Sequence, residues 1–366
     1  MSDRWYDVKN VGEILSPALL IYAERVEENV RRMIAMVGDF ARLRPHIKTH
    51  KMAEMIEVQV ALGIRKFKCA TLAEARMAAG HGAEDILFAY QPVGPNIELL
   101  LKLQASFPHV RFSCLADNPT SGRELASAAA NARTQLEVLI DLDIGQHRTG
   151  IAPDEHALEL YRLIASLPAL KPGGLHAYDG HLHQTDVAER AAACDAAFAP
   201  VETLRRKLER EGMPVPRIVT SGTPTFPMHA RRADVECSPG TCVFWDAGYA
   251  KNLPDLNFLP AAVLLTRVVS KPTSNRLCLD LGHKAVASEM PHPRVAFLNL
   301  DDAKPVVHSE EHLVVETPHA SAFAVGDVIY GIPWHICPTV ALHSEVVVIS
   351  DGRAEDRWKV VARDRV

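Results

Sequence analysis

The strongest constraint on this chain is a repeated alternation of short apolar runs and amphipathic helical patterns over its first 240 residues. The helical patterns are rich in Ala, Leu, Glu and Arg, as in residues 52–62, 72–79 and 187–211. Such alternation is typical of βαβ units and of a parallel sheet. Eight runs predict a (β/α)8 TIM-type barrel, an α/β fold that takes roughly 250 residues. The runs are residues 43–47, 67–70, 86–89, 111–115, 137–142, 174–177, 217–220 and 234–237.

The sequence changes character after residue 250, where helical patterns give way to short β-branched runs separated by turn residues. This pattern predicts an antiparallel all-β domain. One further strand candidate, residues 18–22, precedes the first barrel unit. We therefore expect a barrel over residues 25–250 and a β-rich domain built from residues 1–24 and 251–366. Its expected strands are residues 262–270, 276–281, 294–298, 312–316, 328–330, 345–349 and 358–362.

Composition narrows the class of protein. Apolar residues make up 48% of the chain and charged residues 23%, which is enough apolar matter for a large core and excludes a disordered protein. The net charge of −5 carries no clustered basic excess, so we expect no nucleic-acid partner and no membrane-surface partner. The seven cysteines are scattered and form no CxxC pair, which predicts reduced thiols and a cytoplasmic location.

Functional side chains of a (β/α)8 barrel gather where its strands end. Lys48 directly follows the first run, in Arg44-Pro45-His46-Ile47-Lys48. At the barrel mouth, burial and neighbouring cations would lower the pKa of its amine, as a lysine that forms a Schiff base requires. A basic surface loop is the alternative, and a lysine taken alone favours it.

Two further strand ends carry polar side chains. The fifth run ends in a glycine-containing loop with Arg148, whose fork suits an anionic oxygen, although a surface arginine explains it equally well. Tyr178 follows the sixth run, among three histidines at positions 176, 181 and 183. These histidines form no tight ligand motif, so the sequence favours a structural or substrate-contacting role over a metal site.

The loops after the seventh and eighth runs are small, hydroxyl-bearing and glycine-containing. Barrels of this kind often bind phosphate at these two positions, through exposed backbone N–H groups. Each loop alone is a weak signal, and their joint position is the stronger one. The candidate phosphate ligands are Ser221, Gly222, Thr223, Gly240 and Thr241.

The expected β-rich domain contains His335 and Cys337, an imidazole and a thiol that together suit zinc. In an extended strand these two residues would face the same side and reach one ion. Two ligands leave the shell open, as a catalytic metal needs. A buried histidine and a free core cysteine are the alternative, which the sequence alone favours.

Taken together, these segments resemble the D-threonine aldolase and D-serine dehydratase family over nearly the whole chain. The family comprises pyridoxal-phosphate enzymes with an alanine-racemase-like barrel followed by a β domain. The most specific matches are Arg44-Pro45-His46-Ile47-Lys48 and residues 333–339.

The resemblance implies that Lys48 binds pyridoxal 5'-phosphate covalently, that Arg148 lies beside the cofactor's phenolic oxygen and that Tyr178 lies near its ring. It implies that His335 and Cys337 bind a divalent metal, zinc or manganese, with His335 acting in catalysis beside Lys48. It assigns the phosphate to Ser221, Gly222, Thr223, Gly240 and Thr241.

The resemblance divides on the reaction. At the metal site, D-threonine aldolases commonly have His-x-Asp, whereas the His-x-Cys of this chain resembles the D-serine dehydratase side of the family. Residues 338–343 and 356–362, in contrast, are more similar to the aldolase side. The first hypothesis is a lyase that splits D-threonine into glycine and acetaldehyde. The second is a dehydratase of D-serine or another 3-hydroxy-D-amino acid, which gives a 2-oxo acid and ammonia.

Two other classes remain. A non-catalytic carrier of pyridoxal phosphate would resemble the barrel alone, so the β domain argues against it. A racemase would need a second base opposite Lys48, for which Tyr330 is a weak candidate. The family leads us to expect a homodimer that acts on a small D-amino acid.

Overall fold

The structure, a computed structural model, describes residues 4–365, so both outer ends of the expected β-rich domain lie outside the described residues. The chain forms two compact units. Of the described residues, one unit, the barrel unit, contains Met33–Lys48, Met55–Gly240 and residues 364–365. The other, the β unit, contains residues 4–32 together with Thr49–Glu54 and Thr241–Arg363.

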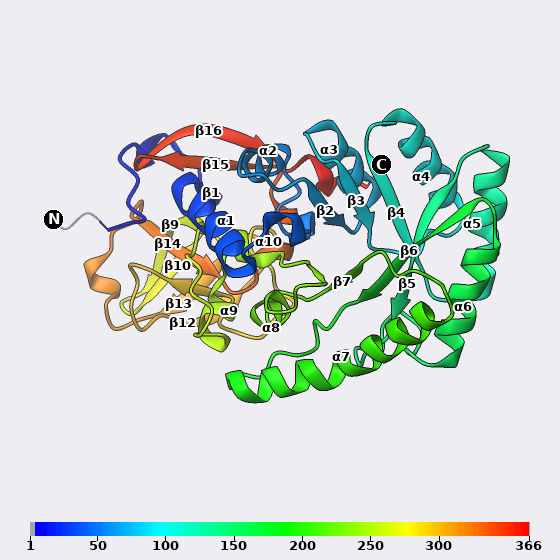
Figure 1. The fold of residues 1–366 in the computed structure, drawn as a ribbon. Helices are drawn as coiled ribbons and strands as arrows, with labels where there is room; N and C mark the ends of the chain where they lie inside the picture. Colours follow the sequence, from blue (N-terminus) through cyan, green and yellow to red (C-terminus); the bar gives the residue numbers. More distant parts are fainter. Residues whose placement is uncertain (1–3, 366) are drawn as a thin grey trace. The chain divides into compact units, whose positions relative to one another are not determined.

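Seven parallel strands in chain order make up the sheet of the barrel unit (Figure 1). Each of the last seven apolar runs overlaps one of these strands, so the alternation correctly predicted them. The strands are β2 (Lys66–Cys69), β3 (Asp85–Phe88), β4 (Arg111–Ala116), β5 (Leu136–Leu142), β6 (Leu170–Ala177), β7 (Ile218–Thr220) and β8 (Glu236–Cys237).

The first apolar run, residues 43–47, is not a regular strand, because Pro45 lacks the N–H that a ladder needs. It nevertheless links both edges of the sheet through isolated parallel bridges, Leu43 to Cys237 of β8 and His46 to Lys68 of β2. The chain then turns into a short 3-10 helix, Ile47–Thr49, which begins one residue before Lys48. The predicted barrel is thus confirmed, with the bridged segment in the place of its first strand.

Helices alternate with these strands, and α4, α5 and α6 lie along the outer side of the sheet in Figure 1. Side-chain caps fix several starts: Thr71 accepts from the Glu74 N–H at the start of α3, and Asn118 and Asp186 do the same for α5 and α7. The helices are α1 (Ala23–Val37), α2 (Ala53–Ala61), α3 (Leu72–Gly80), α4 (Pro95–Ser106), α5 (Pro119–Asn131), α6 (Glu155–Ser166), α7 (Val187–Arg210) and α8 (Phe226–Ala230).

A network of ion pairs crosses the barrel at the N-terminal ends of its strands. Arg44, fully buried, donates to Asp85 Oδ1 over 2.7 Å and to Glu236 Oε2 over 2.6 Å. Arg217 continues the network to Asp85 (3.3 Å) and Glu137 (2.5 Å). We call this network the charged belt; its members are Arg44, Lys66, Asp85, Arg111, Glu137, Arg217 and Glu236.

Apolar side chains fill the barrel beyond the charged belt. Leu87, Leu115, Leu139 and Val219, from β3, β4, β5 and β7, form a buried cluster, and each is at most 1% exposed. This layer closes the interior, so polar chemistry is confined to the two ends of the strands.

The β unit is built on a nine-stranded, mainly antiparallel sheet. One departure from the predicted antiparallel pattern is β1, which pairs parallel with β15 and antiparallel with β9. The prediction also missed β12, and the strand expected over residues 358–362 overlaps only the end of β16. The strands are β1 (Ala18–Tyr22), β9 (Ala262–Thr273), β10 (Arg276–Leu279), β11 (Val295–Phe297), β12 (Lys304–His308), β13 (Leu313–Glu316), β14 (Val328–Pro333), β15 (Glu345–Ser350) and β16 (Arg353–Lys359).

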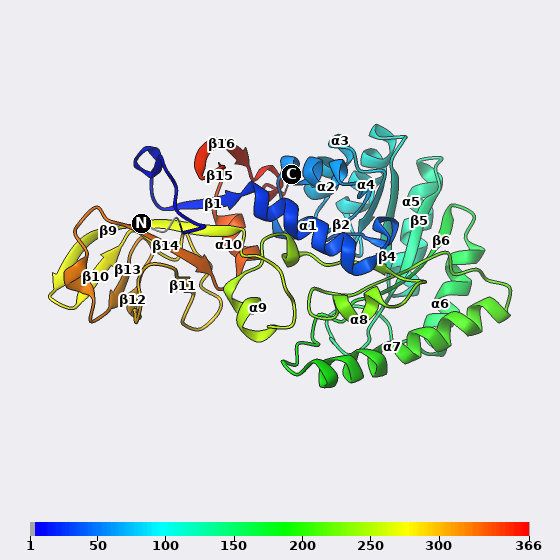
Figure 2. The same cartoon turned by 60° about the vertical axis from the view of Figure 1, so that its left-hand side comes forward.

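In Figure 2, β9, β10, β12 and β13 lie together at the left, and they are neighbours at one end of the strand order of this sheet. Two short helices, α9 (Ala247–Asn252) and α10 (Ile336–Leu342), also belong to the β unit. Its core includes Tyr6, Tyr22 and Tyr330, packed with apolar residues of β1, β9 and β15. Among residues 4–365, no helix combines the length and the apolar composition that a membrane crossing would need.

The charged belt generates a stability prediction. Glu236→Gln removes the carboxylate that faces Arg44 and Lys66 and leaves the side-chain shape unchanged. Breaking a buried ion pair costs about 3–5 kcal/mol, so we expect the free energy of unfolding in urea to fall by about 3 kcal/mol. The control Glu98→Gln breaks an exposed pair with Lys102 and should cost less than about 1 kcal/mol. Equal losses in the two variants would contradict a structural role for the belt.

Candidate active site

Three of the sequence-predicted residues meet at the carboxyl ends of the barrel strands. Lys48 Nζ lies 5.9 Å from the centre of the Tyr178 ring, and Arg148 Cζ lies 5.4 Å from the same centre. Lys48 follows the segment that links β8 to β2, Arg148 lies in the loop after β5, and Tyr178 directly follows β6. The ring therefore has two predicted cations around it.

Lys68, on β2, is a third cation at this ring and was missed from the sequence. Its Nζ lies 5.1 Å from the Tyr178 ring centre, and the residue is 2% exposed. Burial, followed by the charge of Lys48, lowers the pKa of Lys68 to about 7. The available signal was a lysine inside a short apolar strand, where a charged side chain needs a reason to be buried.

A chain of hydrogen bonds holds Lys68. Its Nζ lies 3.1 Å from His176 Nε2, and His176 Nδ1 lies 2.6 Å from Asp141 Oδ1. Gln91 Nε2 then donates to Asp141 Oδ2 over 2.7 Å and to Asp117 Oδ2 over 2.9 Å. Burial lowers the pKa of His176, which favours its neutral form. A small cavity of about 30 Å³ adjoins this chain, lined in part by Asp141, Arg148, His176 and Tyr178.

The predicted phosphate loops contact each other. The Ser238 N–H donates to Ser221 Oγ over 3.1 Å, and the Gly240 N–H donates to Thr223 Oγ1 over 3.3 Å. The Gly222 N–H donates to Asp179 Oδ1 over 3.0 Å. The Gly222 N–H is therefore already used and is not free to bind a phosphate. The glycine instead leaves space beside Tyr178, because a Cβ at this position would lie 3.2 Å from Tyr178 Cε2.

These loops are supported by a buried cluster of three side chains, Asp179, Cys194 and His229. Asp179 Oδ1 also accepts from Thr225 Oγ1 (2.7 Å), and its Oδ2 lies 2.8 Å from His229 Nε2. Cys194 Sγ lies 3.2 Å from the same nitrogen. Although these ligand-type atoms lie within 4.8 Å of one another, hydrogen bonds account for their contacts. Burial raises the pKa of Cys194 to about 12, so the thiol stays protonated.

In the β unit, His335 and Cys337 lie at the start of α10, where His335 is the residue before the first turn. The prediction that they face the same side of a strand was wrong, because β14 ends at Pro333. The two side chains still meet through a hydrogen bond. His335 Nδ1 also lies 2.5 Å from Glu289 Oε1, and Cys337 Sγ lies 3.2 Å from Thr49 Oγ1.

The electrostatics of this pair favour a charged thiolate. Burial would lower the pKa of His335, but the hydrogen bond and charge of Cys337, with help from Glu289, raise it to about 9. For Cys337, burial alone would raise the pKa, but the hydrogen bond and charge of His335 outweigh burial and lower the pKa of the thiol. Thr241, which also contacts the Cys337 sulfur at 3.5 Å, lies in a 3-10 helix, Thr241–Val243. A thiolate and an imidazole oriented by a carboxylate form a donor set that fits a zinc-like ion.

Tyr330, the weak candidate for a racemase base, is 5% exposed and packs with Tyr6 at a ring-centre distance of 5.3 Å. Burial raises the pKa of Tyr330 further. A phenol held in this core is poorly placed to exchange protons with a substrate.

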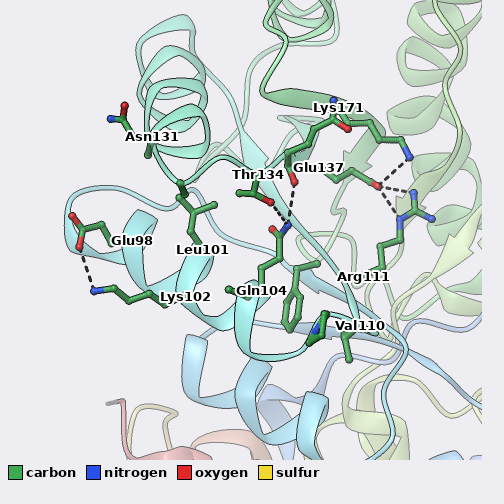
Figure 3. Close-up of a pocket in the computed structure, with 16 residues that line it drawn as sticks. Glu98, Leu101, Lys102, Gln104, Val110, Arg111, Asn131, Thr134, Glu137 and Lys171 are labelled. Atoms are coloured by element: carbon green, nitrogen blue, oxygen red, sulfur yellow. Dashed lines mark hydrogen bonds and ion pairs between the residues drawn. The ribbon is translucent and has the colours of Figure 1, made fainter.

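A large groove lies at the opposite end of the barrel strands from Lys48. This groove has a volume of about 750 Å³ and is lined by α4, α5 and the starts of β4 and β5 (Figure 3). Its charged wall is part of the charged belt, since Arg111 binds Glu137 there over 2.7 Å. Size alone does not make it the reaction site, because barrels carry their chemistry at the carboxyl ends of the strands.

Comparison with known proteins agrees with this geometry. Residues 21–247 match the family "Alanine racemase, N-terminal domain", and residues 261–349 match "Putative serine dehydratase domain". A D-threonine aldolase of Arthrobacter sp is 32% identical, over 96% of this chain and 94% of the relative. A 3-hydroxy-D-aspartate aldolase of Paracoccus denitrificans is 29% identical, over 97% and 93%. The crystal structure of a D-threonine aldolase from Filomicrobium marinum superimposes with a TM-score of 0.88 at 26% identity, over 96% of this chain and 95% of that one.

The fold and the relatives together show that the protein is a lyase that depends on pyridoxal phosphate. Within that class the chain belongs to the D-threonine aldolase and D-serine dehydratase family, whose barrel is the alanine racemase N-terminal domain. The family predicted from the sequence is therefore confirmed.

The support of the phosphate loops by Asp179 can be tested. Asp179→Asn turns an acceptor of several hydrogen bonds into a group that also carries donors. Losing a buried hydrogen bond costs about 1–3 kcal/mol, so we expect pyridoxal phosphate to bind about tenfold more weakly. Fluorescence titration of the apoprotein measures this affinity. Asp234→Asn, which alters an exposed pair with Arg205, should leave it unchanged. Unaltered binding in Asp179→Asn would remove Asp179 from the supporting role.

Proposed function

We propose that this protein is a metal-assisted, pyridoxal phosphate-dependent lyase of D-β-hydroxy-α-amino acids that splits D-threonine into glycine and acetaldehyde. The observation that carries the proposal is Lys48 beside the Tyr178 ring at the carboxyl ends of the barrel strands. An amine there can hold an aldehyde cofactor covalently, and the ring offers a flat apolar face to a pyridine.

The residues at the barrel mouth fit the cofactor. Arg148 and Lys68 bring positive charge to a site that would take a phenolic oxygen and a substrate carboxylate. Ser221, Thr223 and Gly240 would hold the phosphate, with Thr241 next in the chain. Gly222 would keep the space beside Tyr178 open. When bound, pyridoxal phosphate supplies an electron sink for the pair that bond cleavage leaves on the α-carbon.

His335 and Cys337 would hold a divalent metal, and Glu289 would orient the imidazole. Such an ion supplies Lewis acidity toward an oxygen ligand such as a β-hydroxyl. The thiolate favours zinc, and manganese is the second candidate. In the chain, Thr49 and Thr241, which contact the Cys337 sulfur, directly follow Lys48 and Gly240.

In cleavage of D-threonine, the hydroxyl proton leaves for a base and the Cα–Cβ bond breaks. The α-carbon then takes up a proton to give glycine, and the other fragment leaves as acetaldehyde. The chain must therefore orient the Cα–Cβ bond, remove one proton and supply another. Arg148 and Tyr178 would orient the reacting molecule in the mouth, which limits the bonds that can break.

Dehydration of D-serine or another 3-hydroxy-D-amino acid is the second candidate. The observation that favours it is the thiol ligand at position 337, since His-x-Cys resembles the dehydratase side of the family. Dehydration would remove the α-proton and expel the β-oxygen, giving a 2-oxo acid and ammonia.

Product analysis decides between the two reactions. The protein loaded with pyridoxal phosphate and zinc or manganese is supplied with D-threonine and then D-serine, and both product pairs are quantified. We expect glycine and acetaldehyde in equal amounts from D-threonine. Pyruvate or 2-oxobutyrate with ammonia would establish the dehydratase instead. Lys48→Ala should give neither and should lose the absorbance band of the lysine-bound cofactor. Absence of turnover with every 3-hydroxy-D-amino acid would overturn both reactions.

The metal site gives a separate prediction. Cys337→Ala removes a charged ligand, so bound zinc measured by mass spectrometry and lyase activity should fall together. Cys337→Asp keeps an anionic ligand and should retain metal. Cys278→Ala, a change at a half-buried cysteine on β10, serves as the control. Activity that survives complete chelation would show that the reaction needs no metal.

A further inference from the structure

The barrel mouth holds two lysines rather than the single one that a covalent cofactor needs. Lys48 and Lys68 both face the Tyr178 ring, with their Nζ atoms 5.9 and 5.1 Å from its centre. They come from different segments, since Lys68 lies on β2 and Lys48 follows the segment bridged to it. Burying a second amine beside the first is costly, which calls for an explanation beyond packing.

The surroundings of Lys68 are those of a proton-transfer group. A base is usually oriented by a second residue and that residue by a third. Here His176 contacts the amine over 3.1 Å, and Asp141 binds the far nitrogen of His176 over 2.6 Å. A His176 that donates from Nδ1 to Asp141 leaves its Nε2 to accept from a protonated Lys68. The contact with His176 thereby holds the amine in one position at the Tyr178 ring.

The charge balance around Lys68 allows both of its protonation states. Burial and the cations Lys48 and Arg148 disfavour the ammonium, whereas Asp141 and Asp179 favour it. The resulting pKa of about 7 for Lys68 matches what a group needs in order to give and take a proton near neutral pH. The titratable and charged groups that act on it are Lys48, Asp141, Arg148, His176 and Asp179, and the Tyr178 ring faces its amine.

We propose that Lys68, oriented by His176 and Asp141, is a second catalytic residue that exchanges a proton with the α-carbon of the substrate. The assignment rests on the proposed lyase function, in which the substrate would be held where Lys48 would hold the cofactor. Lys68, whose amine faces the same Tyr178 ring as Lys48, is the group that we place near the α-carbon. In aldol cleavage the Lys68 ammonium gives one proton to Cα, and solvent accepts the hydroxyl proton and restores the lysine, so protons balance.

The first test reads the amine without any reaction. Apoprotein labelled with 13C at lysine Cε is titrated from pH 5 to pH 11 by NMR. We expect one lysine resonance to titrate about 3 units below the usual value near 10.4. That resonance should be absent in Lys68→Met and should shift its midpoint in His176→Gln. If every lysine titrates near its usual pH, the proposal is overturned whatever reaction the enzyme performs.

The second test follows proton transfer apart from bond cleavage. The loaded enzyme is incubated with glycine in D2O, and deuterium entry at Cα is measured. General acid–base groups contribute about 10²–10⁴-fold, so Lys68→Met should slow exchange by at least about 100-fold while the absorbance of the bound cofactor persists. Lys68→Arg keeps the charge but cannot release a proton near neutral pH, so it should not restore exchange.

The outcomes of these tests distinguish failure of proton transfer by Lys68 from failure of the proposed lyase function. Restored exchange in Lys68→Arg would show that only the charge matters and would overturn proton transfer by Lys68. Exchange in the wild type that gives no lyase products with any 3-hydroxy-D-amino acid would overturn the proposed function and leave Lys68 in place. Lys102→Met, an exposed change on α4, should match the wild type in both tests.

Discussion

The charged belt is the interaction on which the barrel depends. Arg44, without solvent contact, sits between Asp85 and Glu236, so it joins the start of β3 to the start of β8. Burial disfavours the charged form of Asp85, but Arg44 outweighs it and holds the pKa of that carboxyl at about 2. Since this pKa lies below the unfolded value, the belt stabilises the fold at neutral pH, and that contribution disappears as the pH falls through the lowered pKa. The closing segment between β8 and β2 is thereby fixed four residues before Lys48.

The two ends of the barrel use charge in opposite ways. At the belt, each buried cation has a carboxylate partner, as Arg217 has Asp85 and Glu137. At the mouth, cations gather around the Tyr178 ring, and among the described residues none of them forms a direct ion pair with a carboxylate; Lys68 contacts His176 instead. Unbalanced positive charge is costly without a ligand and favourable with an anionic one. The mouth is therefore suited to bind a phosphorylated, acidic cofactor and an amino-acid carboxylate. The charged belt stabilises the barrel and so offsets the cost of the positive charge at the mouth.

The sequence predicted the architecture well because barrel strands and helices have different hydrophobic periods, and because side chains at strand ends converge. It predicted Lys48, Arg148 and Tyr178 at one place, and the structure brings them together. It could not predict that Pro45 would reduce the first strand to two isolated bridges. Nor could it predict that His335 and Cys337 lie at the start of a helix, because residues 333–339 form a short segment with two prolines and show no clear period. Lys68 was missed because its place in a short apolar strand does not by itself show that the side chain faces inward, and its partner His176 lies more than 100 residues away.

The cluster behind the phosphate loops has a consequence for how tightly a ligand can be held. Asp179 fixes the Gly222 N–H and the Thr225 hydroxyl through contacts that are fully buried. The loop is thus rigid before anything binds, and the entropy of ordering it is lost during folding rather than during association. Affinity for a phosphorylated ligand then depends on residues that never contact it: a change at Cys194, in the first half of α7, would weaken binding by making the loop more mobile.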